Sequence, residues 1–258
     1  MRDDPPAVVV PGEQAVTVFE LAPGVRAAFT GRRGGVSRAP YGSLNMGAGS
    51  GDVVGDVTHN RKLVATACGL APDHMIWMRQ VHGADVGYVP GPQAPADLPP
   101  ARDASITAAP GLALGVLSAD CPGVLVADPE ARIAGAAHAG RQGMARGVVP
   151  ALVRAMTERG ADPARMYAVI GPGICGRCYE VPAGMRDEVG AVVPGAACLT
   201  RAGTPGLDLA AGIAGQFASL GVRRVRADGR CTAEDPDLYS YRRDGRTGRF
   251  AGLVWLTP

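Results

Sequence analysis

Lysine is nearly absent from this chain of 258 residues, where it occurs once, at Lys62, among 26 basic residues. No glycine-rich loop precedes Lys62, so the phosphate-binding loop of P-loop nucleotidases is excluded. No other position could supply a buried lysine for a Schiff base. Enzyme classes that depend on either group are therefore poor fits to this sequence.

Histidine is also scarce. The chain has four, His59, His74, His82 and His138, and no two of them form a His-x-His pair. A blue copper centre takes two histidines and a cysteine, and an attached oxygen-reducing copper cluster needs more. This set cannot ligate a blue, trinuclear copper oxidase, so we expect one small metal site per chain.

The chain also lacks an excess of charge and long apolar runs. Its formal net charge is +2, without a block of either sign, and its longest apolar stretch, 111–127, is interrupted by polar and turn residues. We therefore expect a small-molecule substrate, no nucleic-acid or membrane partner, and a monomer or weak homodimer. The six cysteines are scattered through a chain too long to need disulfides, and residues 1–6 open no signal peptide, which predicts a reducing, cytoplasmic location.

The hydrophobic pattern predicts a single domain, residues 1–258, of the α+β class. With 47% hydrophobic residues the chain can bury a sizeable core, and strands and helices mix without a regular βαβ alternation. Residues 32–51, rich in glycine and serine, are predicted to form a loop that approaches a ligand closely. Strands are predicted over 15–20, 25–30, 75–80, 112–117, 124–127, 133–137, 166–170, 222–227 and 251–256. Helices are predicted over 56–68, 147–159, 183–193 and 207–220.

Three potential metal ligands, His82, Cys121 and His138, each follow an apolar predicted strand. Two imidazoles and a thiolate make a three-ligand zinc site whose fourth position is open, the arrangement expected of catalytic zinc. Asp120 is a candidate to orient one of the histidines. Taken singly, a buried cysteine or a lone histidine is more often simple packing, and spacing alone leaves that interpretation open.

Two further motifs give weaker signals. Cys175 and Cys178 form a Cys-x-x-Cys pair, but a structural zinc needs two more ligands, and no second pair or His-x-x-x-His follows. The flanking residues do not match a thioredoxin-like site. A basic cluster near the C-terminus is interpreted as a solvated turn, with binding of a substrate anion as the alternative. It comprises Arg242, Arg243, Arg246 and Arg249.

A series of short motifs occurs in order along the chain: Arg32-Arg33-Gly34-Gly35-Val36-Ser37, Tyr41-Gly42-Ser43-Leu44-Asn45, Asn60-Arg61, Gln80-Val81-His82-Gly83-Ala84-Asp85-Val86, Ala119-Asp120-Cys121, Ala137-His138-Ala139-Gly140, Gly171-Pro172, Cys178-Tyr179-Glu180-Val181, Cys231-Thr232 and Tyr239-Ser240-Tyr241-Arg242-Arg243-Asp244. From about Phe29 to Leu256 the chain therefore resembles the laccase-domain family. These are bacterial polyphenol-oxidase-like proteins, also described as multifunctional purine nucleoside phosphorylases and as peptidoglycan editing factors.

The resemblance implies one zinc ion per chain, held by His82, Cys121 and His138, which stand in the family's Gln-Val-His, Asp-Cys and His-Ala-Gly motifs. It also implies a four-layer α/β/β/α sandwich of mixed sheets, shared with certain cysteine hydrolases. The chain departs from the family at one point. Members usually read His-Ala-Gly-Trp-Arg-Gly, whereas this chain has Arg141 and Gln142 before the last glycine, so the tryptophan is lost and the arginine is displaced by one position.

The leading functional hypothesis rests on this resemblance and on the open zinc site. It is phosphorolysis of purine nucleosides (adenosine, inosine, guanosine and methylthioadenosine), with inorganic phosphate as co-substrate and adenosine deamination as a second activity. Phosphorolysis passes through an oxocarbenium-like ribose and needs an anion site for phosphate. The three zinc ligands are the expected catalytic residues. Expected substrate contacts are Arg32 for phosphate, Asn45 for ribose, Gln80 for orienting His82 or the base, and Arg141 in the space of the family arginine.

Two alternatives use the same residues. Without a metal, Cys121 would act as a nucleophile, with His138 or His82 as its base, and hydrolyse an amide such as one in a peptidoglycan precursor. A catalytically silent zinc-binding protein would result if the change at Arg141 and Gln142 had emptied the pocket of function. Metal content, together with activity toward nucleosides and muramyl substrates, separates the three.

Overall fold

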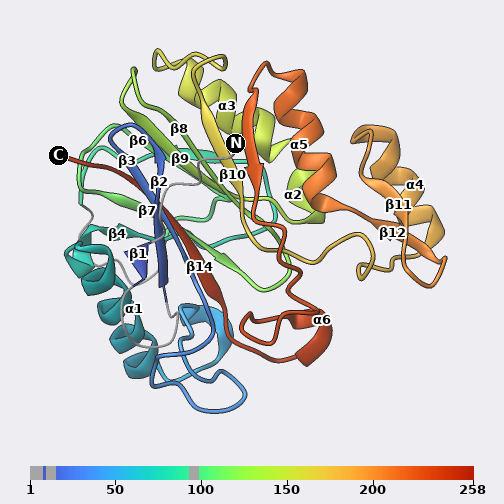
Figure 1. Ribbon diagram of the computed structural model, residues 1–258, viewed down its shortest axis with the longest axis horizontal. Helices are drawn as coiled ribbons and strands as arrows, with labels where there is room; N and C mark the ends of the chain where they lie inside the picture. Colours follow the sequence, from blue (N-terminus) through green and yellow to red (C-terminus); the bar gives the residue numbers. More distant parts are fainter. Residues whose placement is uncertain (1–7, 10–15, 93–98) are drawn as a thin grey trace.

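The computed structural model describes residues 8–9, 16–92 and 99–258. Within them the chain forms two six-stranded mixed sheets and a separate two-stranded hairpin. The two large sheets pack face to face, and helices cover their outer faces (Figure 1). Ala15 of the first predicted strand, and residues 1–6, lie outside the described residues.

The first sheet has the C-terminal strand near its centre. Its order is β1 (Val8–Val9), β2 (Val16–Ala22), β3 (Val25–Thr30), β14 (Phe250–Leu256), β7 (Ala113–Ser118) and β4 (Met75–Ile76). Strand β14 is buried along its whole length, because alternate side chains serve two different layers. Leu253 and Trp255 pack in the cluster under helix α1 (Val54–Cys68), whereas Val254 and Leu256 face the second sheet. Helix α1 ends at Gly69, whose φ of 68° is the left-handed conformation of a glycine cap.

The second sheet carries most of the residues discussed below. Its order is β13 (Arg224–Ala227), β10 (Tyr167–Ile170), β8 (Gly123–Asp128), β9 (Ile133–His138), β6 (Ala104–Thr107) and β5 (Val86–Tyr88). Its outer face is covered by α3 (Val148–Thr157) and α5 (Leu209–Ser219), while α2 (Arg141–Ala145) follows β9 directly. The remaining elements are η1 (Ala48–Ser50), η2 (Pro72–His74), α4 (Ala183–Val192), β11 (Ala197–Leu199), β12 (Pro205–Leu207) and α6 (Tyr241–Asp244).

Three apolar clusters separate these layers. One lies between α1 and the first sheet, one between the two sheets, and one between the second sheet and α3 with α5. The order helix, sheet, sheet, helix is the expected α/β/β/α sandwich, so the α+β prediction is confirmed. Among the described residues, no helix is both long and apolar enough to cross a membrane.

Most predicted elements are present, with shifted ends. The predicted strand over 75–80 is reduced to β4, because residues 77–80 make a single isolated bridge, between Arg79 and Ala101. The predicted helix over 207–220 begins later, since Leu207 pairs in β12 and Asp208 accepts a hydrogen bond as the helix N-cap. Strands β1, β5, β6, β11 and β12 were not predicted, and none of them exceeds four residues.

Candidate metal centre

His82, Cys121 and His138 meet at one edge of the second sheet. His138 is the last residue of β9 and pairs with Gly123, the first residue of β8, so Cys121 lies in the corner that leads into β8. His82 comes from the segment after β4. The candidate ligand atoms of the three side chains lie within 4.8 Å of one another, and the two imidazole rings meet edge to face.

The backbone around this cluster is unusual. His82 and Asp120 have φ angles of 58° and 98°, which are uncommon for residues other than glycine and cluster at functional sites. Gly140 packs directly against the cluster. A Cβ atom there would lie 2.5 Å from Cys121 Sγ and 3.3 Å from His82 Cδ2. The glycine of the His-Ala-Gly motif is therefore required because a side chain there would collide with the cluster, and not because of its backbone angles.

Asp103, which directly precedes β6, holds both histidines of the cluster in place. Its side chain is fully buried and accepts a hydrogen bond from Nδ1 of His138 at 2.9 Å. It also accepts three backbone N–H bonds of 2.7 to 3.0 Å, from Val81, His82 and Gly83. One carboxylate thus fixes the ring of one histidine and the backbone of the other. It also leaves Nε2 of His138 as the nitrogen free to bind a metal.

The electrostatics favour a charged pair at the centre. Burial would raise the pKa of the Cys121 thiol, but hydrogen bonds with His138 and His82 lower it well below its ordinary value. Burial would lower the pKa of His138, but its bonds to Asp103 and Cys121 raise it. Burial would also raise the pKa of Asp103, and the hydrogen bonds that it accepts, led by that of His138, lower it. Cys121 is therefore poised as a thiolate, the form that binds metals and attacks electrophiles.

Asp120 does not orient a histidine, contrary to the sequence prediction. Its carboxylate accepts hydrogen bonds from the hydroxyls of Thr232 and Ser240, at 2.6 and 2.7 Å, and from the backbone N–H of Arg242 at 2.7 Å. Its positive φ turns the side chain toward the C-terminal segment, away from the imidazoles. Asp120 therefore ties the Cys121 corner to α6.

The donor set fits a zinc ion. Two neutral imidazoles and a thiolate are ligands that zinc prefers over carboxylates, and three protein ligands leave one tetrahedral position for a small molecule. His138 is 4% exposed, whereas His82 is exposed. The cluster is thus anchored in the core on one side and opens to solvent on the other.

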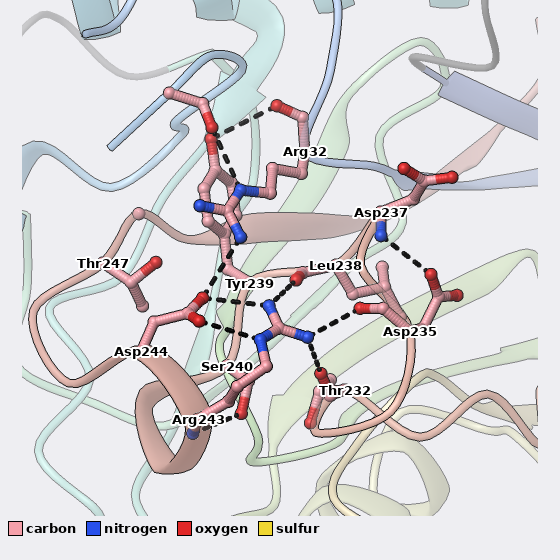
Figure 2. A network of polar contacts seen from close by, with 12 residues as sticks. Arg32, Thr232, Asp235, Asp237, Leu238, Tyr239, Ser240, Arg243, Asp244 and Thr247 are labelled. Atoms are coloured by element: carbon pink, nitrogen blue, oxygen red, sulfur yellow. Dashed lines mark hydrogen bonds and ion pairs between the residues drawn. The ribbon is translucent and has the colours of Figure 1, made fainter. Parts of the chain in front are cut away.

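Arg32 lies in a polar network that also includes α6 (Figure 2). Its guanidinium pairs with Asp244 at 3.1 Å, donates to the carbonyl of Gly42 and lies over the ring of Tyr239. Asp244 also pairs with Arg243 through both carboxylate oxygens, at 2.8 and 2.9 Å. Two guanidinium groups thus share the Asp244 carboxylate, while Asp235 and Asp237 lie in the same network (Figure 2).

The other predicted substrate contacts have diverse surroundings. Asn45 is fully buried, and its amide bonds to Ser50, Asp52 and two backbone N–H groups. The amide of Gln80 bonds both the N–H and the carbonyl of Leu117, at 2.8 Å each. Both side chains therefore have strong structural partners, and their substrate contacts stay predictions.

Arg141 opens helix α2, directly after Gly140. Within the described part of the chain its guanidinium forms no ion pair. It is thus a cation beside the cluster whose charge is available to a ligand.

Sequence reasoning missed Asp103 and misread Arg249. Asp103 stands in no motif and precedes a strand that was not predicted, so nothing marked it. Arg249 belongs to the cluster interpreted as a solvated turn, but it is half-buried, and its guanidinium donates to the carbonyls of Thr247 and Gly248. Burial lowers its pKa, and the negative charges of Asp120 and Cys121 act in the opposite direction. It therefore lies within electrostatic range of the metal centre.

Comparison with known proteins places the chain in a family. A purine nucleoside phosphorylase of Streptomyces coelicolor is 55% identical over 234 residues, which is 90% of this chain and 96% of that protein. One from Mycobacterium tuberculosis strain H37Rv is 48% identical over 234 residues, covering 90% of this chain and 92% of that one. The crystal structure of YlmD from Geobacillus stearothermophilus superposes with a TM-score of 0.88 at 30% identity, covering 98% of this chain and 100% of the other. The profile of the family described as multi-copper polyphenol oxidoreductase laccase matches residues 26–257. The chain belongs to this family.

Proposed function

We propose that the chain is a zinc-dependent purine nucleoside phosphorylase acting on adenosine, inosine, guanosine and methylthioadenosine, with adenosine deaminase as a second activity of the same pocket. The observation that carries the proposal is the convergence of His82, Cys121 and His138 within 4.8 Å, in a chain whose relatives are named purine nucleoside phosphorylases. Bound there, zinc would supply a Lewis acid and lower the pKa of a coordinated water, which deamination requires.

We propose one zinc ion at this centre rather than several coppers. The family description mentions a multi-copper enzyme, but a blue centre with its oxygen-reducing cluster needs many imidazoles. Of the other two histidines, His59 lies on α1 and His74 bonds the carbonyl of Gly111 through Nδ1. Neither belongs to the cluster.

Different residues of the chain have different proposed roles in phosphorolysis. Asp103 holds His138 in one tautomer and fixes the backbone at His82, so the donors are preorganised. Arg32 is proposed to bind phosphate, supported by its sharing of the single Asp244 carboxylate with a second guanidinium group, that of Arg243. This network reaches the metal centre through α6, whose N-cap Ser240 bonds Asp120. Asn45, Gln80 and Arg141 remain proposed contacts to ribose, base and phosphate.

The dependence of purine release on added phosphate tests this proposal, because it identifies the nucleophile. With adenosine or inosine as substrate, free purine and ribose 1-phosphate should form in proportion to added phosphate, whereas conversion of adenosine to inosine should proceed without it. Release of free base at the same rate in phosphate-free buffer would identify a hydrolase. If no base is released from any purine nucleoside, the phosphorylase assignment is wrong.

Arg32→Ala separates the two activities. It should lower phosphorolysis by roughly 10²-fold, as removal of one charge-stabilising contact does, and leave deamination nearly intact. Arg33→Ala is the matched control, since Arg33 is the adjacent arginine and pairs with Asp237, but its side chain is 60% exposed against 27% for Arg32. Equal losses in both variants, or an equal loss of both activities in Arg32→Ala, would remove Arg32 from the phosphate site.

A second candidate is a metal-free cysteine hydrolase acting on an amide, as in a peptidoglycan precursor. It is favoured by the alignment of Asp103, His138 and Cys121, which reproduces the carboxylate, imidazole and thiolate of cysteine hydrolases. The Cys121 thiolate would form a carbon–sulfur bond as the carbon–nitrogen bond breaks, and His138 would protonate the departing amine. Water would then hydrolyse the thioester, releasing the acid and restoring the thiolate. Amide hydrolysis that persists in strong chelator would favour this reading, whereas bound zinc without any turnover would indicate a silent binding protein.

A further inference from the structure

A second group of metal-ligating side chains lies apart from the centre described above. It comprises Cys175, Cys178, Cys231 and Glu234, whose candidate ligand atoms all lie within 4.8 Å of one another. Its members come from two loops, because Cys175 and Cys231 are 56 residues apart. The Cys-x-x-Cys pair, a weak signal in the sequence for want of two more donors, thus acquires both of them in three dimensions.

Sheet topology explains why these loops meet. Strands β10 and β13 are parallel neighbours, with Ile170 paired to Ala227 at their ends. Parallel strands end at the same edge of a sheet, so the loops that follow them leave side by side. An isolated bridge between Gly173 and Cys231 continues the pairing into the loops. Sheet pairing therefore fixes the relative positions of the two loops that carry the sulfur atoms.

A backbone N–H group points at one of the sulfur atoms. The N–H of Cys175 donates to Sγ of Cys231 at 3.3 Å. A hydrogen bond of this kind favours a thiolate, the form that binds metals.

Cations balance the charge that three thiolates would bring. Arg177 lies 3.6 Å from Glu234, and Arg201 forms an ion pair with the same carboxylate. Three thiolates, the Glu234 carboxylate and a divalent ion together carry two net negative charges, and two nearby guanidinium groups reduce the electrostatic penalty of holding them. Another cysteine, Cys198, is close by, but its Sγ donates to the carbonyl of Gly176 and does not belong to the group.

We propose that Cys175, Cys178 and Cys231 bind a second zinc ion, with Glu234 completing a tetrahedral set. Three sulfur ligands and a fully occupied coordination sphere are typical of structural rather than catalytic zinc. A disulfide would use only two of the three thiols and leave the third beside it. The second ion would join the loops after β10 and β13.

This ion would support the metal centre indirectly, through Asp120. The loop that carries Cys175 donates from the N–H of Ile174 to the Asp120 carbonyl at 2.9 Å. The segment that carries Cys231 donates from the hydroxyl of Thr232 to the Asp120 carboxylate. Both loops therefore hold the positive-φ residue that precedes Cys121.

Zinc content of purified protein, measured by elemental analysis, tests the proposal without reference to activity. We expect about two zinc ions per wild-type chain, about one in Cys121→Ala, about one in Cys231→Ala and none in the double variant. Cys198→Ala is the matched control and should keep both ions. X-ray absorption of the zinc left in Cys121→Ala should show mainly sulfur neighbours at about 2.3 Å and a single oxygen at about 2.0 to 2.2 Å from Glu234, without the outer-shell scattering that imidazole rings would give.

Two results would overturn the proposal. One is a folded Cys121→Ala protein, checked by its thermal melt, that holds no zinc. The other is a wild-type mass lower by two hydrogens, with two fewer free thiols than the six of the fully reduced chain, which would identify a disulfide in place of the ion. If Cys231→Ala fails to fold, Glu234→Gln provides the test at the protein surface, and it should weaken zinc binding in the Cys121→Ala background. Failure of this proposal leaves phosphorolysis untouched, and a failed phosphorolysis assay leaves these metal counts unchanged.

Discussion

Replacing Asp103 with asparagine should loosen the metal at the first centre more than any other conservative change. The carboxylate accepts four hydrogen bonds, three from backbone N–H groups and one from His138. Asparagine keeps one acceptor oxygen and presents an NH₂ group to the remaining donors. When the NH₂ group takes the Oδ1 position, which serves His82 and His138, the imidazole of His138 loses the partner that fixes its tautomer. Losing such a partner typically weakens metal binding by about 10- to 100-fold.

The same substitution also affects folding. About two donors would lose their acceptor, and each buried group left unpaired costs about 1–3 kcal/mol. Asp103→Asn should therefore lower the free energy of unfolding by roughly 2–6 kcal/mol, a large share of the 5–15 kcal/mol typical of a domain. Zinc affinity is measured by competition with a chromophoric chelator, and stability by denaturant unfolding of the metal-free protein.

Asp128 provides a matched control for the loss of stability. It too is a fully buried carboxylate that accepts three backbone N–H bonds, from Glu130, Ala131 and Asp162, and pairs with a cation, Arg165. It stands at the far end of β8, roughly 17 Å along the strand from the metal centre. Asp128→Asn should lose comparable stability and keep its zinc affinity. An Asp103→Asn protein that binds zinc as tightly as wild type would refute the reasoning.

Three further predictions follow from the same contacts. Gly140→Ala should displace Cys121 or His82, since its Cβ would lie 2.5 Å from Sγ, and zinc affinity should fall with an overpacking cost of about 1–3 kcal/mol; wild-type affinity would show that the site can relax. Cys121→Ala should abolish turnover, whereas Cys178→Ala should lower the melting temperature more than kcat; equal loss of kcat in both would show that the wrong cysteine was assigned. Burial would raise the pKa of Asp128, but its bonds from Asp162 and Arg165 lower it, so the stability it adds is complete above the ordinary value of about 3.9 and is lost as pH falls through the lower folded value. The gap in unfolding free energy between wild type and Asp128→Asn should therefore narrow in acid, and a gap that widens would contradict this sign.

Long elements and strand ends were readable from the sequence, and short elements were not. Helices α1 and α3 and strands β8, β9 and β14 have enough residues for a helical pattern or an apolar run to stand out. Strand β6 has only four residues, too few for its alternation of apolar and polar side chains to mark a strand. Since β6 was missed, so was Asp103 at its start. A site residue was thus lost through a missed element rather than through its own chemistry.

Contacts made through sheet pairing were predictable only where the two residues flank strands that are close in sequence. His138 and Cys121 flank a hairpin, β8 with β9, whose two strands are close in sequence, so their proximity could be foreseen. Cys231 and Glu234 reach the Cys-x-x-Cys pair through a parallel pairing that spans three intervening elements, α4, the β11–β12 hairpin and α5. No local spacing encodes such a contact, which is why the motif appeared incomplete.

One edge of the second sheet collects both groups of ligands. Strands β9, β10 and β13 end there, and β8 and β6 begin there, because β8 is antiparallel to β9 and β10, while β6 is antiparallel to β9. Gly123 is the shared register position: it pairs with His138 on one side, and its carbonyl accepts the N–H of Gly171 on the other. The corner carrying Asp120 and Cys121 therefore stands between the two groups. A change that shifts the register of β8 should disturb both metal counts together, whereas a side-chain change in either group should remove only one.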